Sequence, residues 1–192
     1  QLQQDPKPRS GGLFPRNHWQ EFEIFPSPLI EIVQFIDAAQ KPGISNDYSV
    51  LATWARTQSG YYLLDLWRDK TDMPTLEEIV KVYYNKWHPS AVVIEDKSGG
   101  SSLIQYLFRS TTIPVLAYDP GQRDKEIRAT AATPTVKAGK CYLPKGALWV
   151  KDFKSEHEKF PKGAHDDQVD TTSMMVDYWG RRLGLEPRVR QL

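Results

Sequence analysis

The first half of the chain is organised as short apolar segments separated by turn-forming residues. Three segments rich in β-branched and aromatic residues cover 29–39, 48–56 and 61–69. Apolar stretches of this length, bounded by Gly, Pro, Ser and Asn, predict β-strands. The residues between the second and third segments, TQSG at 57–60, leave room only for a tight connection. We therefore expect three consecutive antiparallel strands.

Helical periodicity begins after residue 70. In TLEEIVKVYYNKW, residues 75–87, the apolar residues recur on one face of a helix from Leu76 to Trp87. Thr75 followed by Glu78 predicts a capping box at the start of this helix. This part of the chain therefore predicts an amphipathic helix that packs on the strands.

The second half of the chain alternates between strand and helix signals. AVVIED (91–96) and IPVLAY (113–118) are continuous apolar segments, which are typical of buried strands. Helices are expected at 98–110, 124–139, 147–160 and 166–183, and a short strand at 140–144. Pro134 is expected to break or restart the second of these helices, and Gly139 to end it. This order predicts an α/β fold whose mixed central sheet has three antiparallel strands and then parallel strands, with helices on both faces.

The two ends of the chain differ from this central region. Residues 1–29 combine Gly, Pro and charge with scattered aromatic residues, which predicts an extended arm or linker. We expect one domain at 30–182 and a basic tail at 183–192.

Composition excludes several classes of protein. The single cysteine, Cys141, excludes an internal disulfide framework and a cysteine-rich zinc site, and its strand-like surroundings predict a buried residue. No apolar stretch approaches 18 residues, so we expect no membrane span. The 25 basic and 24 acidic residues balance, so net charge identifies no partner. Nucleic-acid binding remains compatible with this balance if the acids cluster and the bases surround them.

Acidic side chains stand where two expected strands end and where the last helix begins. They are Asp37, Glu95 with Asp96, and the group Asp166, Asp167 and Asp170. Acids at a helix start commonly only stabilise the helix. However, Asp167 and Asp170 are three residues apart and share a helical face. An acid at the end of a buried strand is also costly unless it is paired or binds a cation.

Carboxylates that converge repel one another unless a cation lies among them. The hard cations Mg²⁺ and Mn²⁺ prefer oxygen ligands. Two such ions can stabilise the attacking and leaving oxygens of a phosphoryl displacement. The pattern therefore predicts a metal-dependent phosphodiesterase if the three groups of acids meet.

Four motifs resemble a known family when they are taken in this order: FIDAA…SNDYSV, VVIEDKSGGSSLIQYL, DKEIRA…AGKCYLP and GAHDDQVD. The chain is similar to the C-terminal nuclease domain of the large terminase subunit of tailed bacteriophages. The start, QQDPKPRSGGLFPRNHW, is similar to the segment that ends the upstream ATPase domain in that family. The resemblance implies an RNase H-like fold and an endonuclease that cuts concatemeric double-stranded viral DNA during genome packaging in the host cytoplasm.

The resemblance also implies roles for individual residues. Asp37, Glu95 and Asp167 are the expected catalytic residues, with Asp37 bridging two Mg²⁺ or Mn²⁺ ions. Asp166 and Asp170 are further expected metal ligands, and the choice among the three helix aspartates stays open. Two more candidates complete the set: Asp96, the alternative to Glu95, and His165, a cap, hydrogen-bond partner or ligand.

Basic residues near these acids are expected to contact the DNA backbone. The candidates are Lys97, Arg123, Lys125 and Arg128, each of which is otherwise a solvated residue. The resemblance implies the portal, the small terminase subunit and self-association as partners of the full-length protein, with a monomeric isolated domain. No GxxxxGK[ST] motif occurs, so we expect no ATPase activity from this chain.

Two other functions remain open. One is a different RNase H-like nuclease, such as a Holliday-junction resolvase or a transposase catalytic domain. The other is a catalytically silent DNA-binding or scaffold domain of the same fold.

Overall fold

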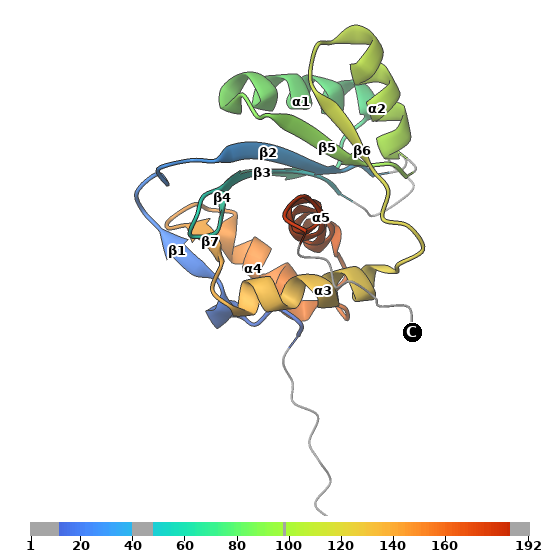
Figure 1. The fold of residues 1–192 in the computed structure, drawn as a ribbon. Helices are drawn as coiled ribbons and strands as arrows, with labels where there is room; N and C mark the ends of the chain where they lie inside the picture. The colour runs from blue at the N-terminus through green and yellow to red at the C-terminus, as the bar shows by residue number, and fades with distance from the viewer. Residues whose placement is uncertain (1–11, 40–47, 98, 185–192) are drawn as a thin grey trace, which may run out of the picture.

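The computed structural model describes residues 12–39, 48–97 and 99–184. They form a seven-stranded sheet of order β1-β7-β4-β3-β2-β5-β6, with α1 and α2 on one face and α3, α4 and α5 on the other (Figure 1). The strands are β1 (Gln20–Phe22), β2 (Glu31–Asp37), β3 (Ser49–Arg56), β4 (Tyr61–Asp69), β5 (Ala91–Glu95), β6 (Val115–Tyr118) and β7 (Cys141–Pro144). The helices are η1 (Arg16–His18), α1 (Met73–Trp87), α2 (Gly99–Ser110), α3 (Lys125–Lys137), α4 (Val150–Lys159) and α5 (Asp167–Arg182). Within these residues, no helix has both the length and the apolar character needed to cross a bilayer.

The strand directions confirm the expected mixed sheet. β2, β3 and β4 pair antiparallel, as the three apolar segments predicted. β5 is parallel to β2, and β6 is parallel to β5. β7 is parallel to β4, and β1 is parallel to β7.

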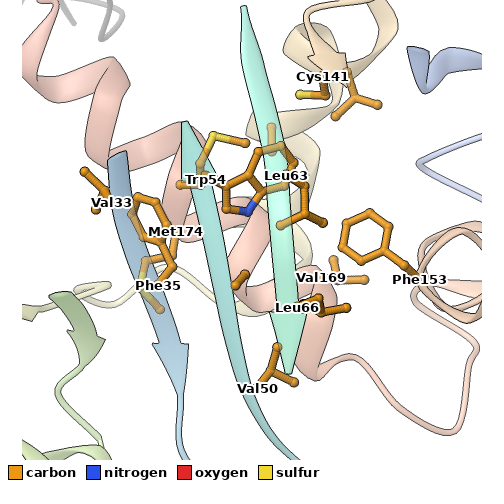
Figure 2. Close-up of a cluster of buried hydrophobic side chains, with 14 of the residues drawn as sticks. Val33, Phe35, Val50, Trp54, Leu63, Leu66, Cys141, Phe153, Val169 and Met174 are labelled. Carbon is orange, nitrogen blue, oxygen red and sulfur yellow. The ribbon is translucent and has the colours of Figure 1, made fainter. Parts of the chain in front are cut away.

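Two hydrophobic cores lie on opposite faces of the sheet. Side chains of a strand alternate between faces, so Val33 and Phe35 join the core beneath α5, whereas Ile36 joins the core beneath α1 and α2. Figure 2 shows Phe35, Trp54 and Met174 within the first core. Both cores are closed by helices, so the central strands are buried on both faces.

Two sequence predictions about strands and boundaries need correction, and the predicted burial of Cys141 is confirmed. β6 is an edge strand on which Leu116 is 45% exposed, so 113–118 is not a buried strand. The described part of 1–29 is not a free arm, because Phe14 is fully buried and β1 pairs with β7. Cys141 is buried as predicted, and burial raises the pKa of its thiol.

Helix starts and interruptions also differ from the sequence predictions. α1 begins two residues earlier than expected, and its cap is Asp72. The Asp72 carboxylate accepts a hydrogen bond from the Thr75 backbone N–H, so the predicted capping box at Thr75 was wrong. α3 runs through Pro134 without a break. Gly139, with φ of +69°, follows the end of α3 as expected.

Candidate metal centre

Strand pairing brings the first two acidic groups to one end of the sheet. β2 and β5 are parallel neighbours, with Ile36 opposite Ile94, so their last residues, Asp37 and Glu95, lie at the same edge. Asp37 follows Val33 and Phe35 with a spacing of two, and Glu95 follows Ala91 and Val93 in the same way. Because these apolar residues lie in the core beneath α5, both carboxylates are on the α5 face.

The same alternation separates Asp96 from Glu95. Asp96 is exposed, and its Oδ1 accepts a hydrogen bond of 2.6 Å from the Ser101 hydroxyl at the start of α2. Glu95 is only 6% exposed and lies with Asp37. The structure therefore places Glu95, and not Asp96, among the converging acids.

Two glycines allow α2 to begin directly over these strand ends. A Cβ atom on Gly100 would lie 2.0 Å from the Glu95 carbonyl oxygen, and one on Gly99 would lie 2.3 Å from the Ala39 carbonyl oxygen. Any other residue would force the backbones apart. Gly99 and Gly100 therefore allow the close packing of α2 on the ends of β2 and β5.

The start of α5 completes the group. A cavity of about 220 Å³, which we call the carboxylate pocket, is lined by acids from three elements and by three other polar side chains. The acids are Asp37, Glu95, Asp166, Asp167 and Asp170, and the other polar residues are Tyr48, Lys97 and Lys125. Asp167 and Asp170 are 5% and 2% exposed, so the helical face that they share is turned inward.

Burial and crowding resist ionisation of these acids. The pKa of Asp37 is raised well above its ordinary value by burial and by the charges of Asp170 and Glu95. Burial and the charges of Glu156 and Asp166 raise the pKa of Asp167 to about 6. Burial, assisted by the charge of Glu95, raises the pKa of Asp170 to about 6 against the opposing effect of nearby cations. Such concentrated negative charge is typical of a cation site.

Two basic residues of α3 partly offset this charge. The Lys125 ammonium lies 2.9 Å from Asp166 Oδ1 and 2.6 Å from Asp170 Oδ2. The buried Arg128 guanidinium reaches Asp170 Oδ1 at 3.1 Å and Glu95 Oε1 at 3.4 Å. In residues 12–39, 48–97 and 99–184, no three His, Cys, Asp or Glu side chains are gathered as a ready set of metal ligands.

The chemistry of the pocket nevertheless fits a hard divalent cation. Its acidic oxygens are the ligand type that Mg²⁺ and Mn²⁺ prefer. Asp167 Oδ2 is buried without a hydrogen-bond partner, and its nearest cation, Arg68 Nη2, is 3.9 Å away. A buried carboxylate oxygen in this state is stabilised by a metal ion. Asp37, Glu95, Asp167 and Asp170 are therefore the residues suited to hold one.

The cap of α5 comes from another helix. Asp166 occupies the N-cap position, but its side chain makes no capping hydrogen bond; it pairs with Lys125 instead. The Gln168 backbone N–H donates to Glu156 Oε1 of α4 at 2.7 Å, and the Gln168 side chain donates to Glu156 Oε2 at 2.6 Å. Asp166 therefore does not cap α5, although it stands at the N-cap position.

Sequence reasoning missed Glu156 and its counter-ion Arg68. Arg68 Nη2 lies 3.2 Å from Glu156 Oε2, and its guanidinium carbon lies 3.7 Å from the centre of the Tyr48 ring. One signal was present: Phe153, Glu156 and His157 recur at helical spacing, and all three are buried. His157 is buried: its Nδ1–H donates to the Phe153 carbonyl oxygen, its Nε2 accepts from the Thr172 hydroxyl, and burial lowers its pKa to about 3.

Of the four residues expected to contact DNA, the two lysines line the carboxylate pocket and the two arginines do not. Lys97 and Lys125 line the carboxylate pocket and are 56% and 48% exposed. The Arg128 side chain is 2% exposed, so the expectation that it contacts DNA was wrong. Arg123 pairs with Asp177 of α5 at 3.2 Å and lines a different cavity.

His165 lies beside the pocket rather than among its lining residues. Its ring meets the Tyr48 ring edge-on, with centres 5.0 Å apart. A larger cavity, of about 720 Å³, lies between α3 and α5, but its lining is mainly apolar and its only acid, Asp177, is already paired with arginines. The carboxylate pocket is therefore the better candidate for chemistry.

Comparisons with known proteins address the family and the fold of this chain. A family described as the terminase RNaseH-like domain matches residues 34–178, which is more than half of the chain. No curated protein sequence matches.

Solved structures share the fold at low sequence identity. The large terminase of a thermophilic bacteriophage, in complex with ADP, superimposes with a TM-score of 0.67 at 12% identity over 87% of this chain. This chain spans 44% of that protein, which is less than half of its length. The large terminase nuclease of the thermophilic phage G20c with bound magnesium gives a TM-score of 0.63 at 14% identity, covering 87% of this chain and 97% of that one. The G20c nuclease with bound cobalt gives 0.64 at 14% identity, covering 87% and 97%.

Proposed function

The chain belongs to the family of terminase RNaseH-like domains, and from this premise we propose that it is a divalent-metal-dependent endonuclease that cleaves double-stranded DNA during viral genome packaging. One observation carries the proposal: acids from β2, β5 and α5, distant in sequence, line one small pocket at the carboxyl edge of the parallel strands. Solved structures of a similar nuclease hold magnesium or cobalt, which supports a divalent cation here.

We assign the metal-binding roles from the electrostatics of the pocket. Asp37 feels the charges of Asp170, Glu95 and Asp167, so it faces the acids of both other elements. We therefore propose that Asp37 would be the central ligand for Mg²⁺ or Mn²⁺ ions, and that Glu95 and Asp167 would complete the ligand set. Asp170 and Asp166 are further ligands or hold the surrounding charge.

When bound, such ions lower the pKa of a water molecule and stabilise the leaving 3′-oxygen of the phosphodiester. The protein contributes the fixed positions of its carboxylates. Arg128 holds Glu95 and Asp170 from the buried side, and the close packing of Gly99 and Gly100 fixes the strand end that carries Glu95. This rigidity keeps the acids together despite their mutual repulsion.

Lys97 and Lys125 are the proposed contacts to the DNA backbone. Both side chains are about half exposed and lie at the mouth of the carboxylate pocket. A lysine provides a point charge for a phosphate without reading the base sequence. We therefore expect binding that depends strongly on salt and weakly on sequence.

The family supports a proposal for the biological setting. The bacteriophage protein in complex with ADP is a large terminase, and this chain spans less than half of its length. We propose that this chain is the nuclease part of a comparable protein, acts in the host cytoplasm, and has no ATPase activity of its own. The portal, the small terminase subunit and further copies of the large subunit are its proposed partners, whereas the isolated domain is a monomer.

The proposal is tested by nicking of supercoiled plasmid at millimolar Mn²⁺. Wild-type protein is expected to nick and linearise the plasmid, EDTA to stop the reaction, and Asp37→Asn to abolish it while the circular dichroism spectrum stays unchanged. Asp152→Asn, an exposed acid on α4, is the matched control and is expected to cleave normally.

A panel of supercoiled plasmid, linear duplex and four-way junctions separates the competing functions. A strong preference for four-way junctions over linear duplex would favour a resolvase. Failure of the wild-type protein to cut any DNA at millimolar Mn²⁺, while it still binds duplex, would favour a catalytically silent binding domain.

A further inference from the structure

The cap of α5 is supplied by Glu156, a side chain of the preceding helix α4. The first turn of a helix has backbone N–H groups without partners inside the helix. At α5 the second residue, Gln168, is 1% exposed, so its N–H cannot turn to water. Glu156 accepts this N–H at 2.7 Å.

Because Glu156 caps the helix, Asp166 does not have to do so. Asp166 stands at the N-cap position, where an aspartate ordinarily accepts a hydrogen bond from the first turn. Its carboxylate instead lines the carboxylate pocket and pairs with Lys125. Without Glu156, the unsatisfied Gln168 N–H would draw the Asp166 carboxylate back toward the helix axis.

Glu156 also controls a competing cation. Arg68 Nη2 lies 3.2 Å from Glu156 Oε2 but 3.9 Å from Asp167 Oδ2. Both carboxylates are buried, so Arg68 would gain most by pairing fully with Asp167 if Glu156 were absent. Glu156 therefore keeps Arg68 from closing on Asp167, an acid of the pocket with an unpartnered buried oxygen.

We infer that Glu156 is a positioning residue of the metal centre: by capping α5 from α4 it leaves Asp166 available to a divalent cation, and by pairing with Arg68 it leaves Asp167 available. This inference rests on the proposed function of the carboxylate pocket. Glu156 itself does not line that pocket, so it acts through Gln168 and Arg68 and not as a ligand.

The test compares Glu156→Ala with Glu156→Gln and with Glu158→Ala. Glutamine keeps an acceptor for the Gln168 N–H but removes the charge. Glu158 lies on the same helix and pairs with Arg16 at the surface, so it is the matched control. Two quantities are measured for each protein: Mn²⁺ affinity by titration calorimetry, and hydrogen exchange of the amides in the first turn of α5.

Glu156→Ala is expected to speed exchange in that turn and to weaken Mn²⁺ binding by about 5- to 30-fold, the equivalent of one lost cap. Glu156→Gln is expected to restore the protection but only part of the affinity, because it keeps the acceptor for the Gln168 N–H and loses the charge that holds Arg68. Glu158→Ala is expected to resemble the wild type. Circular dichroism establishes that each variant is folded.

Three outcomes would overturn the inference. Slow exchange in Glu156→Ala would show that Glu156 is not the cap. Fast exchange with wild-type Mn²⁺ affinity would show a structural role only. Affinity lost equally in Glu156→Gln, with the amides still protected, would show that the charge of Glu156 matters and not its cap. Absence of Mn²⁺ binding by the wild-type protein would instead contradict the proposed function, and the exchange measurement would still decide whether Glu156 is the cap.

Discussion

Replacing Arg128 by methionine should destabilise the metal-free protein strongly. The Arg128 side chain is 2% exposed and pairs with Glu95 and Asp170, whose side chains are 7% and 3% exposed. Methionine fills much of the space of the arginine stem but leaves two buried carboxylates without this counter-ion. Removing one partner of a buried ion pair typically costs about 3–5 kcal/mol, because the remaining charge stays buried.

Urea unfolding in EDTA, followed by tryptophan fluorescence, measures this loss of unfolding free energy. An unchanged m-value shows that the variant and the wild type expose the same amount of surface on unfolding. Arg123→Met is the matched control on the same side of the molecule. Arg123 pairs with Asp177 but is 39% exposed, so its loss should cost no more than about 1 kcal/mol. Saturating Mn²⁺ should restore part of the stability that Arg128→Met loses, because a divalent ion supplies positive charge to the same carboxylates.

The reasoning is refuted if Arg128→Met loses less than about 1 kcal/mol in EDTA, as the control does. That result would mean that Glu95 and Asp170 gain protons or water at no large cost once the arginine is gone. A full loss that Mn²⁺ does not reduce would show that Arg128 stabilises the fold independently of the pocket.

Two further predictions concern the acids themselves. Asp167→Asn should stabilise the metal-free protein relative to the wild type by up to about 3 kcal/mol at pH 7 and by little at pH 4, as urea midpoints in EDTA would show. The stability gain appears at high pH because the pKa of Asp167 in the folded protein, about 6, exceeds the ordinary 3.8. The folded wild type therefore keeps its proton to higher pH and loses stability as pH rises through this range. A stability difference between variant and wild type that stays constant across pH 4–7 would contradict this prediction. Glu95→Gln should reduce plasmid cleavage by about 100-fold or more, whereas Asp96→Asn should cleave almost normally, since Asp96 is bonded to Ser101 outside the pocket; equal losses in both variants would overturn the assignment.

Strand order and direction in the centre of the sheet could be predicted from local pattern. The segments 29–39, 48–56 and 61–69 contain the residues of β2, β3 and β4, and the tight connection at 57–60 required an antiparallel pair. The choice between Glu95 and Asp96 was also within reach. Alternation along β5 places Glu95 on the same face as Val93, and that face carries the core beneath α5.

Other features depended on contacts that no local pattern contains. β1 pairs with β7, more than a hundred residues away, so residues 12–29 resembled a linker in sequence. The burial of Arg128 could not be predicted from the sequence of its helix. Polar residues are distributed around α3, and only the packing of α5 decides which of these residues is buried.

The sequence by itself determined which side chains end the strands and begin the last helix, because periods of 2 and 3.6 residues fix the face on which each lies. It therefore determined that Asp37, Glu95 and Asp167 could meet. Only the tertiary structure decided how their charges are held. Lys125 and Arg128 approach from α3, and Glu156 caps α5 from α4. Capping and ion pairing act over a few ångströms in space, and the chain distances between these partners carry no signal of that closeness.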